Sequence, residues 1–457
     1  MTVNGELALP RRGVLALALG STALVAAACA PGGSGGSAPA PTNSEPVSTD
    51  AASLGEVTLT VWDQNTDTGI NDAQTELNAQ FMAAYPNITI NRVSRSFADL
   101  KTTLKLALSG DDAPDVVQAN QGYPDMGAFV EAGLLLPVDD WAEAYGWTER
   151  YPEDLLSLNT FSADGKTWRE GNLYGVSQTG EIVGLYYDKQ QLSQAGLSAP
   201  VTFQDFEAAL PVLQAAGLQP MQYGDADKSP GIHLFGATLS AIAGEEKAGD
   251  LVSGKGGAWT DPAPLEAATK LSQWAAQRYL PEGHNGVSKA QAVTNFSQGQ
   301  GAFLFQGTWQ QAILQQAMGD RVGFVALSGV DDKPETLGGV GLAWAITSKT
   351  ANANAAAAYI EFITNAAASQ VLVDTGNLPV VLPEGYTAPE GTLAGDIVGQ
   401  WREVSTGGGL VPYLDYATPT FYDTLTAGVQ QLTGGQFTPE QFTESLQEDY
   451  ADFLETR

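Results

Sequence analysis

The chain has 457 residues, of which 52 are Asp or Glu and 21 are Lys or Arg, so its formal net charge is −31. This charge argues against nucleic-acid binding, because affinity for a phosphate backbone comes from clustered Lys and Arg. The chain contains two histidines and one cysteine, too few to build a His/Cys zinc site or a nucleophilic triad readily, so we expect no metal, no cofactor and no catalytic residue.

The N-terminal segment predicts export and a lipid anchor. Arg11 and Arg12 precede an apolar run over 14–28, which ends in small residues directly before Cys29. This is the layout of a secretory signal peptide, and the run is shorter than the roughly 20 apolar residues of a membrane-spanning helix. Small residues before a cysteine resemble the lipobox of bacterial lipoproteins, which implies a signal peptide over 1–28 and lipidation of Cys29. The paired arginines are compatible with export by Sec or by Tat.

Residues 29–55 are predicted to form a flexible tether. They are rich in Gly, Ser, Ala, Pro and Thr and have almost no bulky apolar side chain. Such a segment cannot bury enough surface to offset the chain entropy lost on folding. About 400 residues remain, which is long for one hydrophobic core and predicts two lobes.

The first part of the remaining chain alternates strands and helices. Its sequence pattern predicts strands over 57–62, 88–90 and 115–118, with helices over 72–85 and 100–108 between them. This alternation is typical of an α/β fold with a parallel sheet covered by helices on both faces. Ligands of such sheets bind beyond the carboxyl ends of the strands. The loops after Trp62 and after Gln118 are therefore predicted to contact a ligand.

A series of short motifs continues along nearly the whole mature chain. It includes Leu59–Trp62, Tyr85–Ile88, Ala113–Val117, Leu173–Val176 with Gly184–Lys189, Phe296–Phe303 with Gly307–Trp309, Gly338–Gly341 and Gly376–Val380. In this order and spacing they resemble the family 1 extracellular solute-binding proteins, the sugar-binding components of ABC importers, which are distantly similar to maltose-binding protein. Ser177 and Asp188 stand where that family usually has Pro and Asn.

The resemblance implies a type II fold with two α/β lobes around a ligand cleft and about three chain crossings at the hinge. We expect the crossings near residues 165, 307 and 366. One lobe would then contain 56–165 and 307–365, and the other 166–306 and 366–457. A hinge of this kind lets both lobes contact the ligand and exclude water.

The resemblance also implies positions for the ligand contacts. Carboxylates and amides suit sugars because they accept from or donate to adjacent hydroxyl groups, and an indole ring can stack on the apolar face of a sugar. Asp225 and His233 would face the cleft only if the segment 221–223 is a strand of the sheet, and His233 is equally well explained as a structural histidine. The predicted ligand-binding residues are Gln64, Asn65, Thr66, Asp67, Asn120, Gln121, Glu181, Asp225, Trp309, Gly339 and Asp415.

These features predict a lipid-anchored, monomeric capture protein on the extracellular face of the cytoplasmic membrane. It would bind a carbohydrate, favoured as a short oligosaccharide, and deliver it to an ABC permease without catalysis. Two alternatives stay open. One is a secreted glycoside hydrolase, which needs only two carboxylates at roughly 5–10 Å. The other is a binding protein for a non-sugar solute such as a polyol; a phosphate ester is disfavoured because the loops after Trp62 and Gln118 lack Arg and Lys.

Overall fold

The structure of the protein is a computed structural model and describes residues 41, 45–330 and 332–456. The predicted signal peptide and Cys29 lie outside the described residues, as does most of the predicted tether before residue 45. The prediction of a flexible tether is wrong for residues 46–55, because Asn354 bonds to the Ser48 amide and to the Pro46 carbonyl, both at 3.0 Å, and Ala51 is buried. The described residues belong to one compact unit. None of the helices in this part of the chain is long and apolar enough to cross a membrane.

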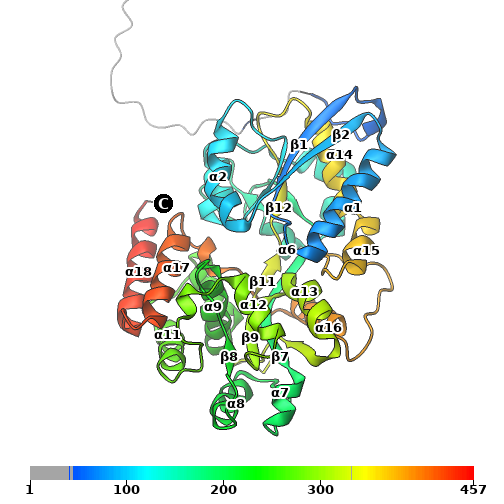
Figure 1. Ribbon diagram of the computed structural model, residues 1–457. Coiled ribbons are helices and arrows are strands. Elements are labelled where there is room, and N and C mark those ends of the chain that lie inside the picture. Colours follow the sequence, from blue (N-terminus) through cyan, green and yellow to red (C-terminus); the bar gives the residue numbers. More distant parts are fainter. Residues whose placement is uncertain (1–40, 42–44, 331, 457) are drawn as a thin grey trace, which may run out of the picture. The chain divides into compact units, whose positions relative to one another are not determined.

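The first sheet has five strands in the order β2-β1-β3-β12-β6 (Figure 1). Their bounds are Val57–Asp63 (β1), Ile88–Ser94 (β2), Val116–Ala119 (β3), Ala343–Ile346 (β12) and Val176–Ser177 (β6). The strand β1 runs parallel to β2 and β3, which confirms the prediction for this part, whereas β12 is antiparallel to β3 and β6. In β1 the residues alternate, so that Leu59 and Val61 enter the core.

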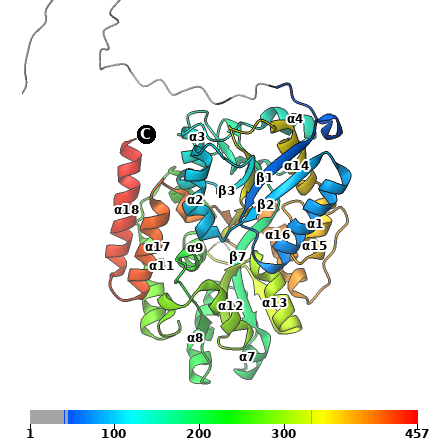
Figure 2. The same ribbon diagram turned by 45° about the horizontal axis from the view of Figure 1, so that its top comes forward.

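Helices cover both faces of the first sheet, with α2 on one side and α1 and α14 on the other (Figure 1). The helix α2 begins after Ser96, whose hydroxyl accepts the Asp99 amide, and ends at Gly110. Helices α14 and α15 pack against α1, as Figure 2 also shows. The helices of this part are α1 (Thr68–Ala84), α2 (Phe97–Ser109), α3 (Ala128–Glu131), α4 (Asp139–Tyr145), α5 (Trp147–Arg150), α6 (Glu153–Ser157), α14 (Ala353–Thr364) and α15 (Ala366–Asp374).

The second sheet has six strands, in the order β13-β11-β7-β9-β8 with β10 also paired to β7. Their bounds are Gly180–Asp188 (β7), Met221–Gln222 (β8), Phe303–Gly307 (β9), Val322–Val325 (β10), Thr336–Val340 (β11) and Leu410–Val411 (β13). A separate two-stranded sheet joins β4 (Thr160–Phe161) to β5 (Asn172–Leu173). The segment 221–223 thus begins as a strand of the second sheet, which is the condition set above for its loop to face the cleft.

Ten helices of the described chain accompany the second sheet. They are α7 (Lys189–Gln194), α8 (Phe203–Ala215), α9 (Ser229–Ala243), α10 (Glu245–Ser253), α11 (Pro262–Ala276), α12 (Lys289–Ser297), α13 (Gln311–Met318), α16 (Leu393–Gly407), α17 (Phe421–Thr433) and α18 (Pro439–Glu455). The helix α9 packs on β9 and β11, and α11, α17 and α18 pack on one another outside it. This arrangement confirms a mixed α/β architecture with two sheets.

Strand pairing moves the chain crossings away from the predicted positions near 165, 307 and 366. The strand β6, at 176–177, still belongs to the first sheet, so the first crossing follows it. The strand β9 belongs to the second sheet, and after the short helix α13 the chain returns to that second sheet, where β10 and β11 pair with β7. The chain reaches the first sheet again only at β12, and α15 still packs on α1. The predicted placement of 307–340 in the first lobe is therefore wrong.

Candidate functional site

A pocket lies where the ends of the first-sheet strands face the second sheet and its helices. It measures about 1070 Å³ when the space open to solvent is counted. Several segments far apart in the chain contribute to it. Its lining residues are Gln64, Asn65, Asp67, Ile70, Phe97, Gln118, Asn120, Thr179, Gly180, Glu181, Ser229, Ile232, His233, Lys289, Thr308, Trp309, Leu342, Asn377, Leu378, Tyr413, Asp415, Tyr416 and Tyr422.

The loop after β1 brings three of the four predicted residues to the pocket. Gln64, Asn65 and Asp67 line it, whereas Thr66 is exposed and does not. The Gln64 amide N–H donates to Gln118 Oε1 at 2.8 Å, and Gln118 Nε2 donates to Asn65 Oδ1 at 3.3 Å. These bonds tie the loop after β1 to the neighbouring strand β3.

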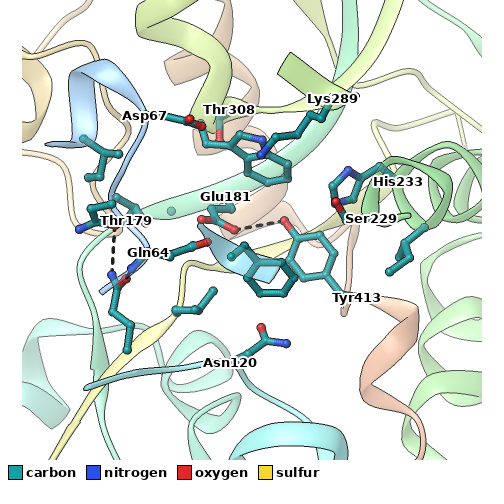
Figure 3. A pocket seen from close by; sticks show the side chains of 18 of the residues that line it. Gln64, Asp67, Asn120, Thr179, Glu181, Ser229, His233, Lys289, Thr308 and Tyr413 are labelled. Atoms are coloured by element: carbon teal, nitrogen blue, oxygen red, sulfur yellow. Dashed lines mark hydrogen bonds between the residues drawn. The ribbon is translucent and has the colours of Figure 1, made fainter. Parts of the chain in front are cut away.

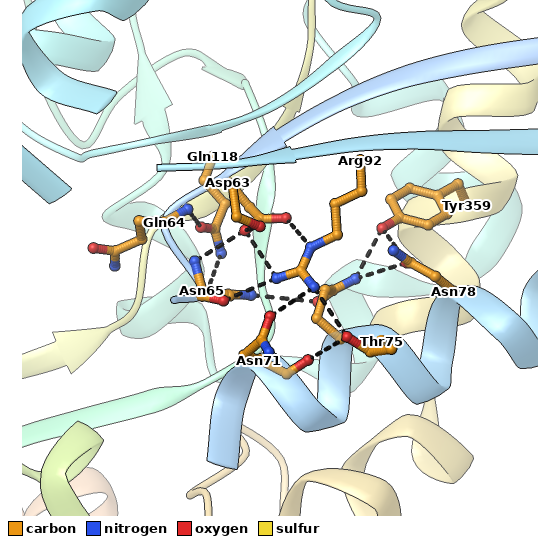
Figure 4. A network of polar contacts seen from close by, with 11 residues as sticks. Asp63, Gln64, Asn65, Asn71, Thr75, Asn78, Arg92, Gln118 and Tyr359 are labelled. Atoms are coloured by element: carbon orange, nitrogen blue, oxygen red, sulfur yellow. Dashed lines mark hydrogen bonds and ion pairs between the residues drawn. The ribbon is translucent and has the colours of Figure 1, made fainter. Parts of the chain in front are cut away.

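A buried ion pair between β1 and β2 holds the same loop in place (Figure 4). Arg92 on β2 donates through Nε to Asp63 Oδ2 at 2.6 Å and through Nη2 to Asp63 Oδ1 at 3.1 Å. The same Nη2 donates to the Asn65 carbonyl at 2.9 Å. Asp63 is fully buried, so loss of this arginine would leave a buried carboxylate without its ionic partner.

Only one of the two residues predicted after β3 faces the pocket. Asn120 lines it, but Gln121 does not. The Gln121 amide donates to Asn159 Oδ1 and to the Gly341 carbonyl, both at 2.9 Å, and its Oε1 accepts from Tyr416 OH at 3.0 Å. Successive residues of an extended chain point in opposite directions, so Gln121 is directed into the protein and holds the pocket wall in place.

Glu181 projects into the pocket from β7 and accepts a hydrogen bond from Tyr413 OH at 3.3 Å (Figure 3). Burial raises the pKa of Glu181 to about 7, against the opposing effects of the Tyr413 hydroxyl and the Lys289 charge. The carboxyl group can therefore donate or accept near neutral pH, which suits a ligand hydroxyl.

Asp415 provides a second buried carboxyl group in the pocket. It is 5% exposed, and burial raises its pKa to about 6, while the charge of Lys101 opposes the rise and that of Asp125 adds to it. Among the described lining residues the carboxylates Asp67, Glu181 and Asp415 face a single cationic side chain, Lys289. The site as a whole is therefore acidic.

Trp309, predicted as a stacking residue, lines the pocket as part of a row of rings. Its ring centroid lies 5.0 Å from that of His233, which is 6.0 Å from that of Tyr413, and Tyr416 follows at 5.7 Å. Burial lowers the pKa of His233 to about 3, so the imidazole is neutral. His233 thus lines the pocket as an uncharged aromatic residue with polar nitrogens.

Besides Thr66 and Gln121, two more predicted residues lie outside the pocket lining, namely Asp225 and Gly339. Asp225 is fully buried beside it, and its Oδ1 accepts the Gly231 amide at 2.8 Å, which positions the start of α9. Gly339 is buried in β11, where it pairs with Glu181. Asp225 therefore supports the pocket wall, and the glycine supports the strand that carries Glu181.

Several polar and aromatic lining residues were not predicted. Tyr413 and Tyr416 flank Asp415, and Thr308 precedes Trp309, so their neighbours in the sequence could have identified them. Lys289 had no such signal, because it reaches the pocket from the start of α12; it also supplies the cation that the loops after β1 and β3 lack. The other unpredicted residues include Phe97, Thr179, Ser229, Asn377 and Tyr422.

The residues give no indication of a metal site. In the described part of the chain no group of three or more His, Cys, Asp or Glu side chains is placed to hold a metal ion. The pocket combines ring faces with carboxyl, amide and hydroxyl groups, which is an arrangement for binding a polyhydroxylated molecule.

The sequence matches, over residues 66–370, the family described as bacterial extracellular solute-binding protein. The chain belongs to this family. The lactose-binding protein of Rhizobium radiobacter is 31% identical over 153 residues, and the match spans 32% of each chain. The multiple sugar-binding protein of Streptococcus mutans is 23% identical over 299 residues, 63% of this chain and 67% of that protein.

Solved structures show the fold of this solute-binding protein independently. A chitin oligosaccharide binding protein superposes with a TM-score of 0.76 at 24% sequence identity, covering 87% of this chain and 98% of the other. This likeness confirms the two-lobed type II architecture.

Proposed function

We propose that this solute-binding protein captures a sugar, most suitably a short oligosaccharide, and releases it unchanged. The observation that carries the proposal is the pocket itself, where the ring faces of Trp309 and Tyr413 stand beside the carboxyl groups of Glu181 and Asp415. Aromatic faces match the C–H faces of sugar rings, and carboxyl groups bind neighbouring hydroxyls. We expect a dissociation constant in the micromolar range or below, about −8 kcal/mol or better.

The relatives support a carbohydrate ligand. Those compared above are described as binding lactose, multiple sugars and chitin oligosaccharides. The roles of the individual lining residues in ligand binding remain predictions, and we assign the central contacts to Gln64, Asp67, Asn120, Glu181, Trp309 and Asp415.

The proposed setting is the extracellular face of the cytoplasmic membrane. Lipidation of Cys29 would anchor the protein, and the part of the predicted tether that precedes residue 46 would let it reach an ABC permease that accepts the sugar. Anchoring raises the local concentration of the protein beside that permease. We propose that the protein acts there as a monomer after export by Sec or Tat.

A thermal-shift screen of the purified protein against a sugar panel tests the proposal. A ligand at about 100 times its dissociation constant stabilises the folded state by about 2.7 kcal/mol, which raises the melting temperature measurably. We expect at least one sugar to do so and to be recovered intact after hours of incubation. A degraded sugar would indicate a hydrolase, and a shift caused only by anions or peptides would refute a carbohydrate ligand.

Replacement of Trp309 by Ala should weaken binding of that sugar by about tenfold, because stacking on an aromatic face contributes roughly 0.5–1.5 kcal/mol beyond the area it buries. Trp62→Ala is the matched control: Trp62 is also half-buried, contacts Arg95 and does not line the pocket. Isothermal titration of both variants measures the effect. Equal sugar affinities of Trp309→Ala and the wild-type protein would show that Trp309 does not contact the sugar.

A further inference from the structure

Asp415 is a buried carboxyl group of the pocket that has no side-chain partner in the described part of the chain. It belongs to the short helix η6 (Leu414–Tyr416), lines the pocket and is 5% exposed. Apart from its own backbone amide, no group among the described residues donates a hydrogen bond to this carboxyl group or forms an ion pair with it. A buried carboxylate without a partner is costly, so the missing partner has to come from the ligand.

The lysines of this region are engaged elsewhere. The charge of Lys101 acts on Asp415, but its Nζ lies 2.5 Å from Asp125 Oδ2 and pairs with that carboxylate. Asp125 adds its own negative charge near Asp415. The charge of Lys289 acts instead on Glu181, whose pKa burial raises. Asp415 is therefore left without a counter-charge of its own.

Tyrosine rings stand beside this carboxyl group. The ring centroids of Tyr413 and Tyr416 are 5.7 Å apart, and both residues line the pocket together with Tyr422. Burial raises the pKa of Tyr416 and Tyr422, and the charge of Asp415 raises it further, so both phenol groups stay neutral. The faces of such rings attract cations. The Tyr422 ring already does so, because the Lys101 ammonium lies 4.5 Å from its centroid.

A carboxylate beside ring faces distinguishes an amine from a hydroxyl group. A sugar hydroxyl can donate one hydrogen bond to Asp415 but brings no positive charge. A protonated amine has three N–H donors, and its charge compensates that of the carboxylate. The net charge of −31 also attracts a cationic ligand to the protein.

We propose that Asp415 and the tyrosine rings beside it bind a protonated amine of the ligand, so that the preferred sugar is an amino sugar with a free amino group. This inference rests on the proposed function and narrows its ligand class. It separates the free-amino sugar both from the plain sugar, which has a hydroxyl group at that place, and from the N-acetylated sugar, whose amide carries no charge.

The experiment compares matched sugars by isothermal titration with the purified protein at pH 6.5. A sugar amine is protonated there, since comparable amino groups have pKa values of roughly 7.7–8.0, and Asp415, with a pKa of about 6, is mostly ionised. The pairs are the free-amine dimer of glucosamine against cellobiose, glucosamine against glucose, and galactosamine against galactose, with the N-acetylated counterparts as a third arm.

We expect the free-amino member of at least one pair to bind tenfold or more tightly than its plain and N-acetylated counterparts. If sugars bind but the gain stays below tenfold in every pair, the inference fails and the proposed function stands. If neither an amino sugar nor any neutral sugar of the wider panel binds, the proposed function itself fails.

Asp415→Asn assigns the preference to this carboxyl group. It removes the charge at nearly constant volume and should reduce the amine preference to less than twofold. Asp423→Asn is the matched control, because Asp423 is exposed and does not line the pocket, and it should keep the preference. A full amine preference in folded Asp415→Asn would overturn the assignment.

A titration of the wild-type protein at pH 5 tests the same assignment without any substitution. Most of the Asp415 carboxyl groups are protonated there, while the sugar amine keeps its charge. The amine preference should fall several-fold between pH 6.5 and pH 5. An unchanged preference would show that another group binds the amine.

Discussion

The position of the Trp309 ring depends on the absence of a side chain at Gly307. A Cβ atom at residue 307 would lie 2.0 Å from the nearest ring atom of Trp309, far inside the contact distance. The φ angle of Gly307 is −82°, which any residue can adopt. Glycine is therefore required here by the ring and not by the backbone.

Substitution of Gly307 by Ala should displace the Trp309 ring and weaken sugar binding about as much as Trp309→Ala, that is, by about tenfold. The fold should persist, since the strained contact is limited to one side chain. Gly256→Ala is the control, because a Cβ at that position meets no atom within 4 Å. Titration monitored by tryptophan fluorescence measures both affinities. Wild-type affinity in Gly307→Ala would show that the ring position does not matter.

Buried carboxyl groups make the stability of the ligand-free protein depend on pH. Burial raises the pKa of Asp225 to about 8 and that of Glu181 to about 7. The folded state then keeps protons that the unfolded state has lost, so stability falls as pH rises from about 4 towards 8. The lowered pKa of His233, about 3, acts in the opposite direction only below its ordinary value of 6.5. The decrease should thus be clearest between pH 6.5 and 8.

Asp225→Asn should remove much of this pH dependence. The variant should melt at a higher temperature than the wild-type protein at pH 8 and show a smaller advantage at pH 6.5, because the wild-type carboxyl group is protonated there. Glu266→Gln, at an exposed position, should leave the profile unchanged. Melting curves of both variants across this pH range provide the measurement. A parallel shift of the Asp225→Asn curve at all pH values would contradict the assignment of the proton to Asp225.

Among the elements, the strand pair β1–β2 positions the loop that reaches the pocket. Arg92 on β2 bonds to Asp63 and to the Asn65 carbonyl. Removal of one partner from a buried ion pair costs about 3–5 kcal/mol, because the remaining charge stays buried without compensation.

We therefore expect Arg92→Met to lower the free energy of unfolding by about 3–5 kcal/mol and to weaken ligand binding through the displaced loop. Arg92→Lys should lower the free energy of unfolding less, because lysine keeps the positive charge beside Asp63. It should still be less stable than the wild-type protein, because lysine cannot form both bonds to Asp63. Urea denaturation gives the stabilities, and titration of the folded fraction gives the affinities. Arg92→Met with wild-type stability would show that Asp63 finds another partner.

The elements also show what the sequence can and cannot predict. Local periodicity was enough to predict the elements β1, α1, β2, α2 and β3. The rule that ligands bind beyond strand ends then pointed to Asn65 and Asn120, both of which line the pocket. The crossing predicted near 307 was misplaced because β10 pairs with residues 185–188 of β7, and the one predicted near 165 because β6 pairs with β12. Both are long-range pairings that no local pattern encodes. Lys289 and Tyr422 reach the pocket only through the packing of α12 and α17, so tertiary structure alone identifies them.

At the scale of the whole molecule, the net charge of −31 should destabilise the folded state at low ionic strength. Like charges on a compact body repel one another, and salt screens them over about 10 Å at 0.1 M. We expect the melting temperature at pH 7.5 to rise by several degrees between about 10 mM and 0.3 M NaCl. Near the sequence pI of about 4.1 the same salt series should have little effect. A melting temperature independent of salt at pH 7.5 would mean that the charges are too well dispersed to matter.

The pocket is built from segments at distant positions of the chain, from Gln64 to Tyr422. A nascent polypeptide therefore has no complete binding site until the ribosome has synthesised residue 422. If the chain is threaded across the membrane unfolded, it assembles the pocket outside and cannot carry a cytoplasmic metabolite with it. If it is exported already folded, it passes through the cytoplasm with a finished site, and a sugar present there would be lost with every molecule secreted. Because the binding site is complete only in the folded chain, the export route would decide whether the cell loses cytoplasmic sugar with each exported molecule.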